Sequence, residues 1–140
     1  ERCSVLPESV ASRIHVAAVS MEDREVNATV VNAVQRVSSV VTQRSLIEAF
    51  GLTVAEAMWK KAPVVASAVG GIRDQIDDGV DGVLVDPADG LAWAEAVRDL
   101  LLFPERAQEM GLAAHESVRR EFLSNRHLQD LLQIVADLVG

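Results

Sequence analysis

One segment joins a helical pattern directly to a buried strand: LTVAEAMWKKAPVVASAV, residues 52–69. Its first part, from Leu52 to Lys61, predicts a helix, and the two final lysines suit the negative end of the helix dipole. Pro63 ends that helix, because proline cannot continue its hydrogen bonding. The apolar run at residues 64–69 does not alternate with polar residues, which predicts a strand that is buried on both faces.

Further strands are predicted on both sides of this segment. Apolar, largely β-branched runs occur at residues 14–19, 39–42 and 83–85. Helical patterns separate each predicted strand from the next. Because strands that alternate with helices form parallel sheets, we expect an α/β, Rossmann-like domain with helices on both faces of its sheet.

The helical patterns have recognisable starts. Ser20 is expected to cap the helix that follows the first strand, with Asp23 as its partner in a capping box. A short acidic helix is predicted at residues 72–77. Three longer helices follow. One starts after a cap at residues 86–89 and ends at Leu102, and the next runs from Pro104 to about Arg120. The third starts after a cap at Ser124. The last of them forms a helical C-terminal tail.

Composition restricts the class of protein. The chain has 140 residues, about the length of one domain, and 49% of them are apolar. A formal net charge of −8 argues against nucleic acid and anionic lipid as partners. It still allows a small anionic ligand that is held by backbone amides. No apolar run reaches the roughly 18 residues that a membrane span requires.

The single cysteine, Cys3, excludes a disulfide framework, and a reducing, cytoplasmic location is expected. The chain begins with Glu1 instead of Met and has no signal-peptide pattern. We therefore expect residues 1–140 to form a single domain that is truncated from a longer enzyme. No group of residues has the spacing of a metal site.

Two turns follow predicted strands at the end of the sheet where ligands bind in open parallel sheets, residues 43–51 and Gly70-Gly71. In the first turn, Phe50, Gly51 and Leu52 open a helix. The free amides and the positive dipole end of that helix can hold a diphosphate. Gly51 allows the backbone to approach such a ligand closely.

Charged side chains surround this helix start. Glu56 lies inside the helix and can accept hydrogen bonds from two ribose hydroxyls, while Glu48 precedes the helix and can meet sugar hydroxyls. Arg44 follows the second strand and can reach a phosphate. The spacing is equally compatible with glutamates that only stabilise a helix N-terminus or lie in solvent.

At these residues the chain resembles the group 1 family of retaining glycosyltransferases. Glu48 and Glu56 match the family signature of two glutamates that are separated by seven residues. The signature and its continuation share the spacing of the family, and they read EAFGLTVAEA (48–57), PVVAS (63–67) and VGGI (69–72). The segment FGLTVAEAMWK (50–60) is similar to trehalose synthases that use a nucleotide donor.

The resemblance implies the GT-B arrangement, in which this chain is part of the C-terminal, nucleotide-sugar-binding domain. It implies that Glu56 binds the donor's ribose hydroxyls and that Glu48 contacts the donor sugar near the reacting carbon. The amides around Phe50, Gly51 and Leu52 would face the diphosphate. The family generally needs no metal, so neither a metal nor a cofactor is expected, and the nucleotide diphosphate sugar is the donor substrate. Since the acceptor domain lies outside this chain, we expect the isolated chain to be inactive.

Three functions remain open from the sequence. The first is the donor-binding half of a retaining hexosyltransferase that moves glucose to an acceptor, such as a second glucose to form trehalose. The second is a trehalose phosphorylase that uses the same residues with phosphate. The third is a non-catalytic nucleotide-binding module that forms homodimers through an open sheet edge.

Overall fold

The protein is described by a computed structural model that covers residues 6–139, without the side chains of Ser124, Asn125, His127, Asp130 and Val139. The chain divides into two units, Glu1–Asn32 and Ala33–Gly140, and each is considered by itself. Cys3 and the side chain of Ser124, the predicted cap of the last helix, lie outside the described residues.

The first unit contains a short helix, α1 (Glu8–Ala11), and the beginning of α2 (Arg24–Val37). The strand predicted at residues 14–19 is wrong, because this segment has no regular secondary structure and Val16 is 88% exposed. A β-branched run becomes a strand only when a neighbouring strand satisfies its backbone groups.

The start of α2 differs from the sequence prediction in one detail. Asp23 caps the helix, because its Oδ1 accepts hydrogen bonds from the amides of Glu25 and Val26, both at 3.0 Å. The prediction that Ser20 caps this helix is wrong. The Ser20 hydroxyl oxygen accepts from the Glu22 amide at 3.1 Å, in the turn before the helix. Both side chains therefore bond backbone amides, but the carboxylate is the cap.

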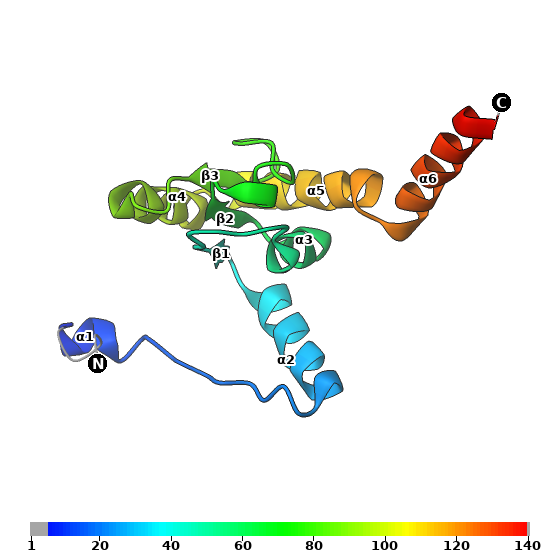
Figure 1. The fold of residues 1–140 in the computed structure, drawn as a ribbon. Coiled ribbons are helices and arrows are strands. Elements are labelled where there is room, and N and C mark those ends of the chain that lie inside the picture. The colour runs from blue at the N-terminus through cyan, green and yellow to red at the C-terminus, as the bar shows by residue number, and fades with distance from the viewer. Residues whose placement is uncertain (1–5, 140) are drawn as a thin grey trace. The chain divides into compact units, whose positions relative to one another are not determined.

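The second unit is built on a sheet of three parallel strands in the order β1-β2-β3 (Figure 1). The strands are β1 (Val41–Gln43), β2 (Val64–Ser67) and β3 (Val83–Val85). All residues of the central strand β2 are buried, as its uninterrupted apolar run predicts. The predicted strands in this unit are confirmed, with shifted ends for the first two.

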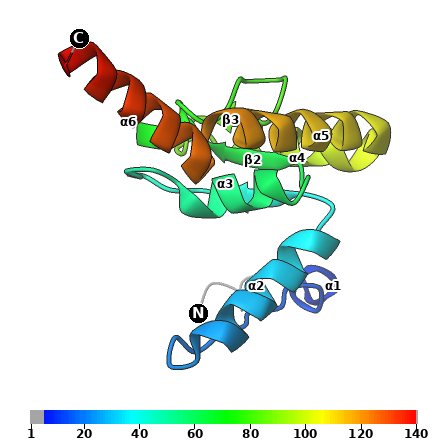
Figure 2. The same cartoon turned by 90° about the vertical axis from the view of Figure 1, so that its right-hand side faces the viewer.

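Helices cover both faces of the sheet (Figures 1 and 2). The helix α3 (Leu52–Trp59) packs on β1 and β2, and α4 (Gly90–Leu102) packs on β2 and β3. A hydrophobic core lies on each face of the sheet, and successive side chains of β2 point into one core and then the other. Val64 and Ala66 pack on the α3 side, and Val65 packs on the α4 side. The predicted Rossmann-like arrangement is confirmed.

A third helix, α5 (Pro104–Glu121), belongs to both cores. Its first half contributes Ala107 and Met110 to the core beneath α4, and its second half contributes Ala114 and Val118 to the core beneath α3. Figure 1 shows α5 running past the sheet from the α4 side to the α3 side. The helices predicted from Pro104 and after residues 86–89 are confirmed.

The segment between β2 and β3 is not the predicted acidic α-helix. It begins with a 3-10 turn, η2 (Gly70–Ile72), and continues as turns, so the helix at residues 72–77 is wrong. The carboxylate of Asp81 accepts from the Asp77 amide at 2.8 Å, and that of Asp78 accepts from the Leu84 amide at 2.8 Å. Such side-chain bonds to backbone amides compete with helix formation.

The predicted C-terminal tail is confirmed as α6 (Ser124–Val139). Its apolar side chains share one stripe and are about half exposed or more, and they are Leu128, Leu131, Leu132, Val135 and Leu138. Within residues 6–139, no helix has both the length and the apolar character needed to cross a membrane.

Candidate functional site

The segments that carry the predicted site residues meet at the carboxyl ends of the strands. Residues 44–51 follow β1, residues 68–75 follow β2, and residues 86–89 follow β3. Because the strands are parallel and adjacent, these three segments lie at the same edge of the sheet. This edge is where open α/β sheets place their ligands.

Backbone packing joins the first two segments. The Gly71 amide donates to the Glu48 carbonyl oxygen at 3.3 Å. A Cβ on Gly70 would lie 1.8 Å from the same oxygen, and a Cβ on Gly71 would lie 2.4 Å from the Ala49 carbonyl oxygen. No side chain larger than hydrogen fits between these two backbones. The glycine pair therefore determines where Glu48 lies.

Gly51 starts α3 in a left-handed conformation, with a φ of 90°. Its carbonyl oxygen accepts from the amides of Val54 at 2.9 Å and Ala55 at 3.2 Å. No side chain caps this helix. The amides of Leu52 and Thr53 are thus left at the positive end of the helix dipole, where an anionic group can accept from them.

Glu48 lies half-buried just before this helix start. Its Oε2 accepts from the Ser45 hydroxyl at 3.4 Å, and the Ser45 oxygen accepts from Gln43 Nε2 at 2.9 Å. This chain of hydrogen bonds begins in β1 and orients the carboxylate. The other carboxylate oxygen is available to a ligand hydroxyl.

Glu56 lies in the second turn of α3 and is also half-buried. Lys60, one turn further on, is its natural helical partner, but Lys60 Nζ donates to Gln35 Oε1 at 2.5 Å instead. In the described part of the chain, no hydrogen bond or ion pair holds the Glu56 carboxylate. The side chain is therefore left for an external partner.

Phe50 is fixed on two sides. Its ring meets the Phe122 ring edge to face, with centroids 6.2 Å apart. Its carbonyl oxygen accepts a short hydrogen bond from Gln75 Nε2. The structure thus brings Glu48, Phe50, Gly51 and Leu52 together in one turn, with Glu56 on the helix that follows.

Arg44 lies apart from this turn. Its Nε and Nη2 donate to the Pro87 carbonyl oxygen at 3.0 and 2.8 Å, and its guanidinium lies 5.7 Å from the Trp93 ring centroid. Arg44 therefore links the carboxyl ends of β1 and β3. Phosphate binding by Arg44 stays a prediction.

Two polar residues at this end of the sheet were not singled out from the sequence. Ser67 ends β2 and is fully buried, and Gln75 is 3% exposed. The Ser67 hydroxyl oxygen and Gln75 Oε1 have no hydrogen-bond partner among the described residues. A polar residue at the end of an apolar run is the available sequence signal for Ser67, whereas Gln75 follows an aspartate in a polar segment and gives no such signal.

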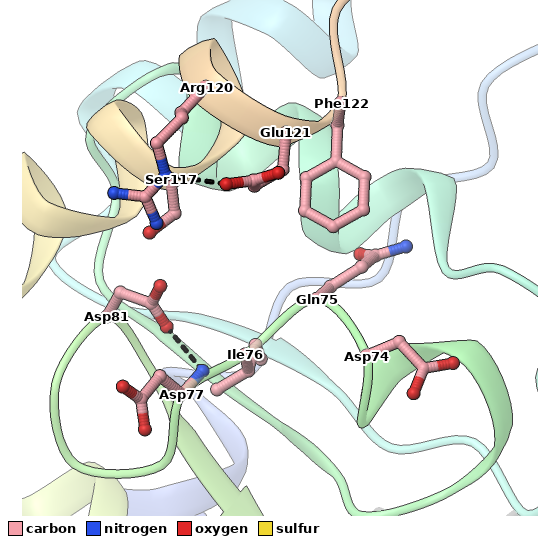
Figure 3. Close-up of a pocket in the computed structure, with 9 residues that line it drawn as sticks. All are labelled: Asp74, Gln75, Ile76, Asp77, Asp81, Ser117, Arg120, Glu121 and Phe122. Atoms are coloured by element: carbon pink, nitrogen blue, oxygen red, sulfur yellow. Dashed lines mark hydrogen bonds and ion pairs between the residues drawn. The ribbon is translucent and has the colours of Figure 1, made fainter. Parts of the chain in front are cut away.

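A pocket of about 220 Å³ lies beside Gln75 (Figure 3). It is lined mostly by residues of the segment between β2 and β3 and of the end of α5, including Asp81, Arg120 and Phe122. Within residues 6–139, no group of three or more His, Cys, Asp or Glu side chains is arranged to hold a metal ion.

Comparison with known proteins assigns this arrangement to a family. The model for group 1 glycosyl transferases matches residues 24–117. A trehalose synthase of Pyrococcus horikoshii is 49% identical over 115 residues, which cover 82% of this chain and 27% of that protein. A D-inositol 3-phosphate glycosyltransferase of Xylanimonas cellulosilytica is 45% identical over 61% of this chain and 20% of that protein.

A solved structure shares this fold. A sucrose-phosphate synthase from Thermosynechococcus elongatus matches with a TM-score of 0.72 and 32% identity, over 89% of this chain and 30% of that one. The chain thus spans about a quarter to a third of the length of the trehalose synthase and of this solved structure.

Proposed function

The chain belongs to the group 1 glycosyl transferases, and we propose that it forms the donor-binding part of a retaining hexosyltransferase. The donor is a nucleotide diphosphate sugar, with glucose as the hexose. One observation supports this most directly. The start of α3 has no side-chain cap behind the left-handed Gly51, and it comes after the half-buried Glu48 and before the half-buried Glu56 in the chain.

The diphosphate is proposed to lie at the start of α3. The amides around Phe50, Gly51 and Leu52 face it there, and the helix dipole favours its negative charge. As the bond to the sugar breaks, negative charge grows on the departing diphosphate. Fixed amide donors stabilise that growing charge without reorganising, which lowers the barrier to transfer.

Glu56 and Glu48 hold the two ends of the donor in this proposal. Glu56 accepts hydrogen bonds from the ribose hydroxyls, and Glu48 accepts from the hexose near its reacting carbon. The acceptor hydroxyl attacks on the face that the diphosphate leaves, so the configuration is retained. The proton of that hydroxyl passes to a departing diphosphate oxygen, and Glu48 stabilises the positive charge that develops on the sugar.

The names of the similar proteins suggest two candidate acceptors. The identity with trehalose synthase extends over 82% of this chain, which favours glucose as acceptor and trehalose as product. The identity with the D-inositol 3-phosphate glycosyltransferase favours a phosphorylated polyol as the second candidate. Product analysis with each acceptor, in the full-length protein, distinguishes the two.

A calorimetric titration tests the donor site. The full-length protein is titrated with ADP-glucose, UDP-glucose and GDP-glucose, and the preferred base identifies the donor. We expect Glu56→Ala to weaken binding by about 1–3 kcal/mol, because it removes hydrogen bonds to a charged group. The control is Glu95→Ala, on an exposed position of α4, which should bind like the parent. Absence of saturable binding to all three donors would contradict the proposal.

A further inference from the structure

We propose that Gln75 is a positioning residue for the donor diphosphate. It holds the peptide between Phe50 and Gly51 so that the Gly51 amide points toward the ligand. The inference rests on the proposed function, because the turn on which Gln75 acts is the turn that would bind the diphosphate.

The contact is long-range and buried. Gln75 lies 25 residues after Phe50 and is 3% exposed, and its Nε2 donates to the Phe50 carbonyl oxygen. Figure 3 shows the Gln75 amide beneath the Phe122 ring, with its nitrogen turned away from Asp81 and Arg120. The side chain therefore reaches out of its own segment to hold the backbone of another.

Peptide geometry carries the effect to the site. No peptide bond among the described residues is cis. In a trans peptide the carbonyl and the N–H point in opposite directions. A carbonyl of Phe50 that is held by Gln75 therefore directs the Gly51 N–H to the opposite side of the turn. No acceptor for this N–H is found in the described part of the chain, so it joins the amides of Leu52 and Thr53 as a free donor.

The turn needs such an anchor because of Gly51. Glycine enters left-handed and right-handed conformations at little cost, so the peptide before it can rotate when nothing holds its carbonyl. Rotation would turn the Gly51 N–H away from the ligand and bring a carbonyl oxygen toward an anion. The hydrogen bond from Gln75 prevents this rotation.

The Oε1 atom of Gln75 is buried and has no hydrogen-bond partner among the described residues, which favours a positioning role for this side chain over a role in packing alone. A buried polar atom without a hydrogen bond is unfavourable, and methionine would fill the space without that disadvantage. The presence of an amide is explained by what its N–H donates to.

The chain offers a matched control in Gln35. This glutamine is also buried, at 5% exposure. Its Nε2 donates to a backbone carbonyl oxygen of α3, that of Thr53, at 3.3 Å. Its Oε1 accepts from Lys60. Gln35→Met thus removes a buried amide that is bonded to α3, without touching the peptide before Gly51.

The experiment compares Gln75→Met and Gln35→Met with the parent in the full-length protein. For each, affinity is measured for ADP, GDP and UDP and for the matching monophosphates. We expect Gln75→Met to reduce the preference for the diphosphate about tenfold, the effect of losing a hydrogen bond to a charged group. Affinity for the monophosphate should change much less, and Gln35→Met should keep the full preference. If Gln75→Met does not fold, Gln75→Leu gives the same comparison, because it also removes the N–H donor and adds no charge beside the site.

The outcomes separate the inference from the proposed function. A parent that prefers the diphosphate, together with a Gln75→Met variant that keeps this preference, overturns the positioning role and leaves the donor site intact. An equal loss of preference in Gln35→Met also overturns it, because any buried glutamine that donates to the backbone around the start of α3 would then have the same effect. A parent that binds no nucleoside diphosphate overturns the proposed function, and the positioning role with it.

Discussion

At the amino-terminal end of β2 the backbone is packed and paired, whereas at its carboxyl end polar groups are left without partners. The contacts of α5 with the backbone before β2 are the evidence for this packing. His115 Nδ1 lies 2.6 Å from the Trp59 carbonyl oxygen, and the two rings stack with centroids 4.5 Å apart. Gly111 brings α5 against the Lys61 carbonyl. A pocket of about 340 Å³ also lies here, beside Lys61 and Pro63. We call this the closed end, because α5 contacts its backbone carbonyl oxygens.

The carboxyl end, or open end, has the opposite character. The Ser67 hydroxyl and Gln75 Oε1 are buried without partners among the described residues, and no side chain caps α3. Unpaired polar groups cost stability, and free donors can bind an anion. The comparison shows that one sheet can gain stability at one end and lose some of it at the other, where the uncapped amides of α3 stay open to an anion.

The largest effect is expected at the closed end, from Gly111→Ala. The new Cβ would lie 2.1 Å from the Lys61 carbonyl oxygen, so α5 must move away from both cores. We expect a loss of about 3 kcal/mol in the free energy of unfolding, measured in urea. The control is Gly90→Ala at the start of α4, where a Cβ has no neighbour within 4 Å. Equal stability of the two variants would show that the end is not closed.

The next effect is expected at the open end, from Gly70→Ala. Gly70 has a φ of 45°, and a Cβ there would displace the Glu48 carbonyl. A shift of Glu48 of about 1 Å should lower kcat/KM of the full-length protein by roughly 100-fold. The stability should fall as well, because alanine is strained at this φ. Unchanged kcat/KM in a folded variant would mean that Glu48 does not depend on the glycine pair.

Ser67→Ala, at the open end, should change the free energy of unfolding in the opposite direction, because this substitution is expected to stabilise the protein. The hydroxyl is fully buried and unpartnered, so its removal should stabilise the protein by about 0.5–1 kcal/mol, measured in urea. Ser38→Ala is the control, because the Ser38 hydroxyl donates to the Val34 carbonyl oxygen at 2.7 Å. That variant should lose about 0.5 kcal/mol. A destabilised Ser67→Ala would instead indicate a hydrogen bond to the hydroxyl in solution.

The smallest effect concerns an exposed ion pair on α5. The Arg119 guanidinium lies 2.6 Å from Glu116, and its hydrogen bond lowers the pKa of the Glu116 carboxyl, while the pKa of Arg119 is raised. A lowered carboxyl pKa stabilises the fold above the ordinary carboxyl value, and this contribution disappears as the pH falls through the lowered value. Because the pair is exposed, Glu116→Gln should leave the melting temperature unchanged at pH 7. A clear decrease would show that this exposed pair contributes to stability.

Local sequence pattern was sufficient where burial follows from the strand itself. The apolar run that includes Val64–Ser67 is buried on both faces, as its composition predicts. The run at residues 14–19 is also mostly apolar but forms no strand, because the pairing that a strand requires is not encoded in the run. Likewise, Asp23 and Ser20 are both good caps, and only the backbone geometry decides between them.

The site was predictable where its residues are close in sequence. Glu48, Gly51 and Leu52 lie in one turn, so their proximity follows from the chain itself. The contacts of Arg44 with Pro87 and of Gln75 with Phe50 span 43 and 25 residues. No periodicity or motif reports such long-range hydrogen bonds, which form only when the sheet brings the segments together.

The helix α5 makes the two faces of the sheet one cooperative unit. Its first half completes one core and its second half completes the other. A fluctuation that detaches α5 exposes both cores together, so neither layer can open as a separate foldon. The amides of β2 should therefore exchange with solvent only through the global unfolding reaction, although the strand is just Val64–Ser67. A short sheet acquires the kinetic protection of a larger one because a single helix is shared by both of its faces.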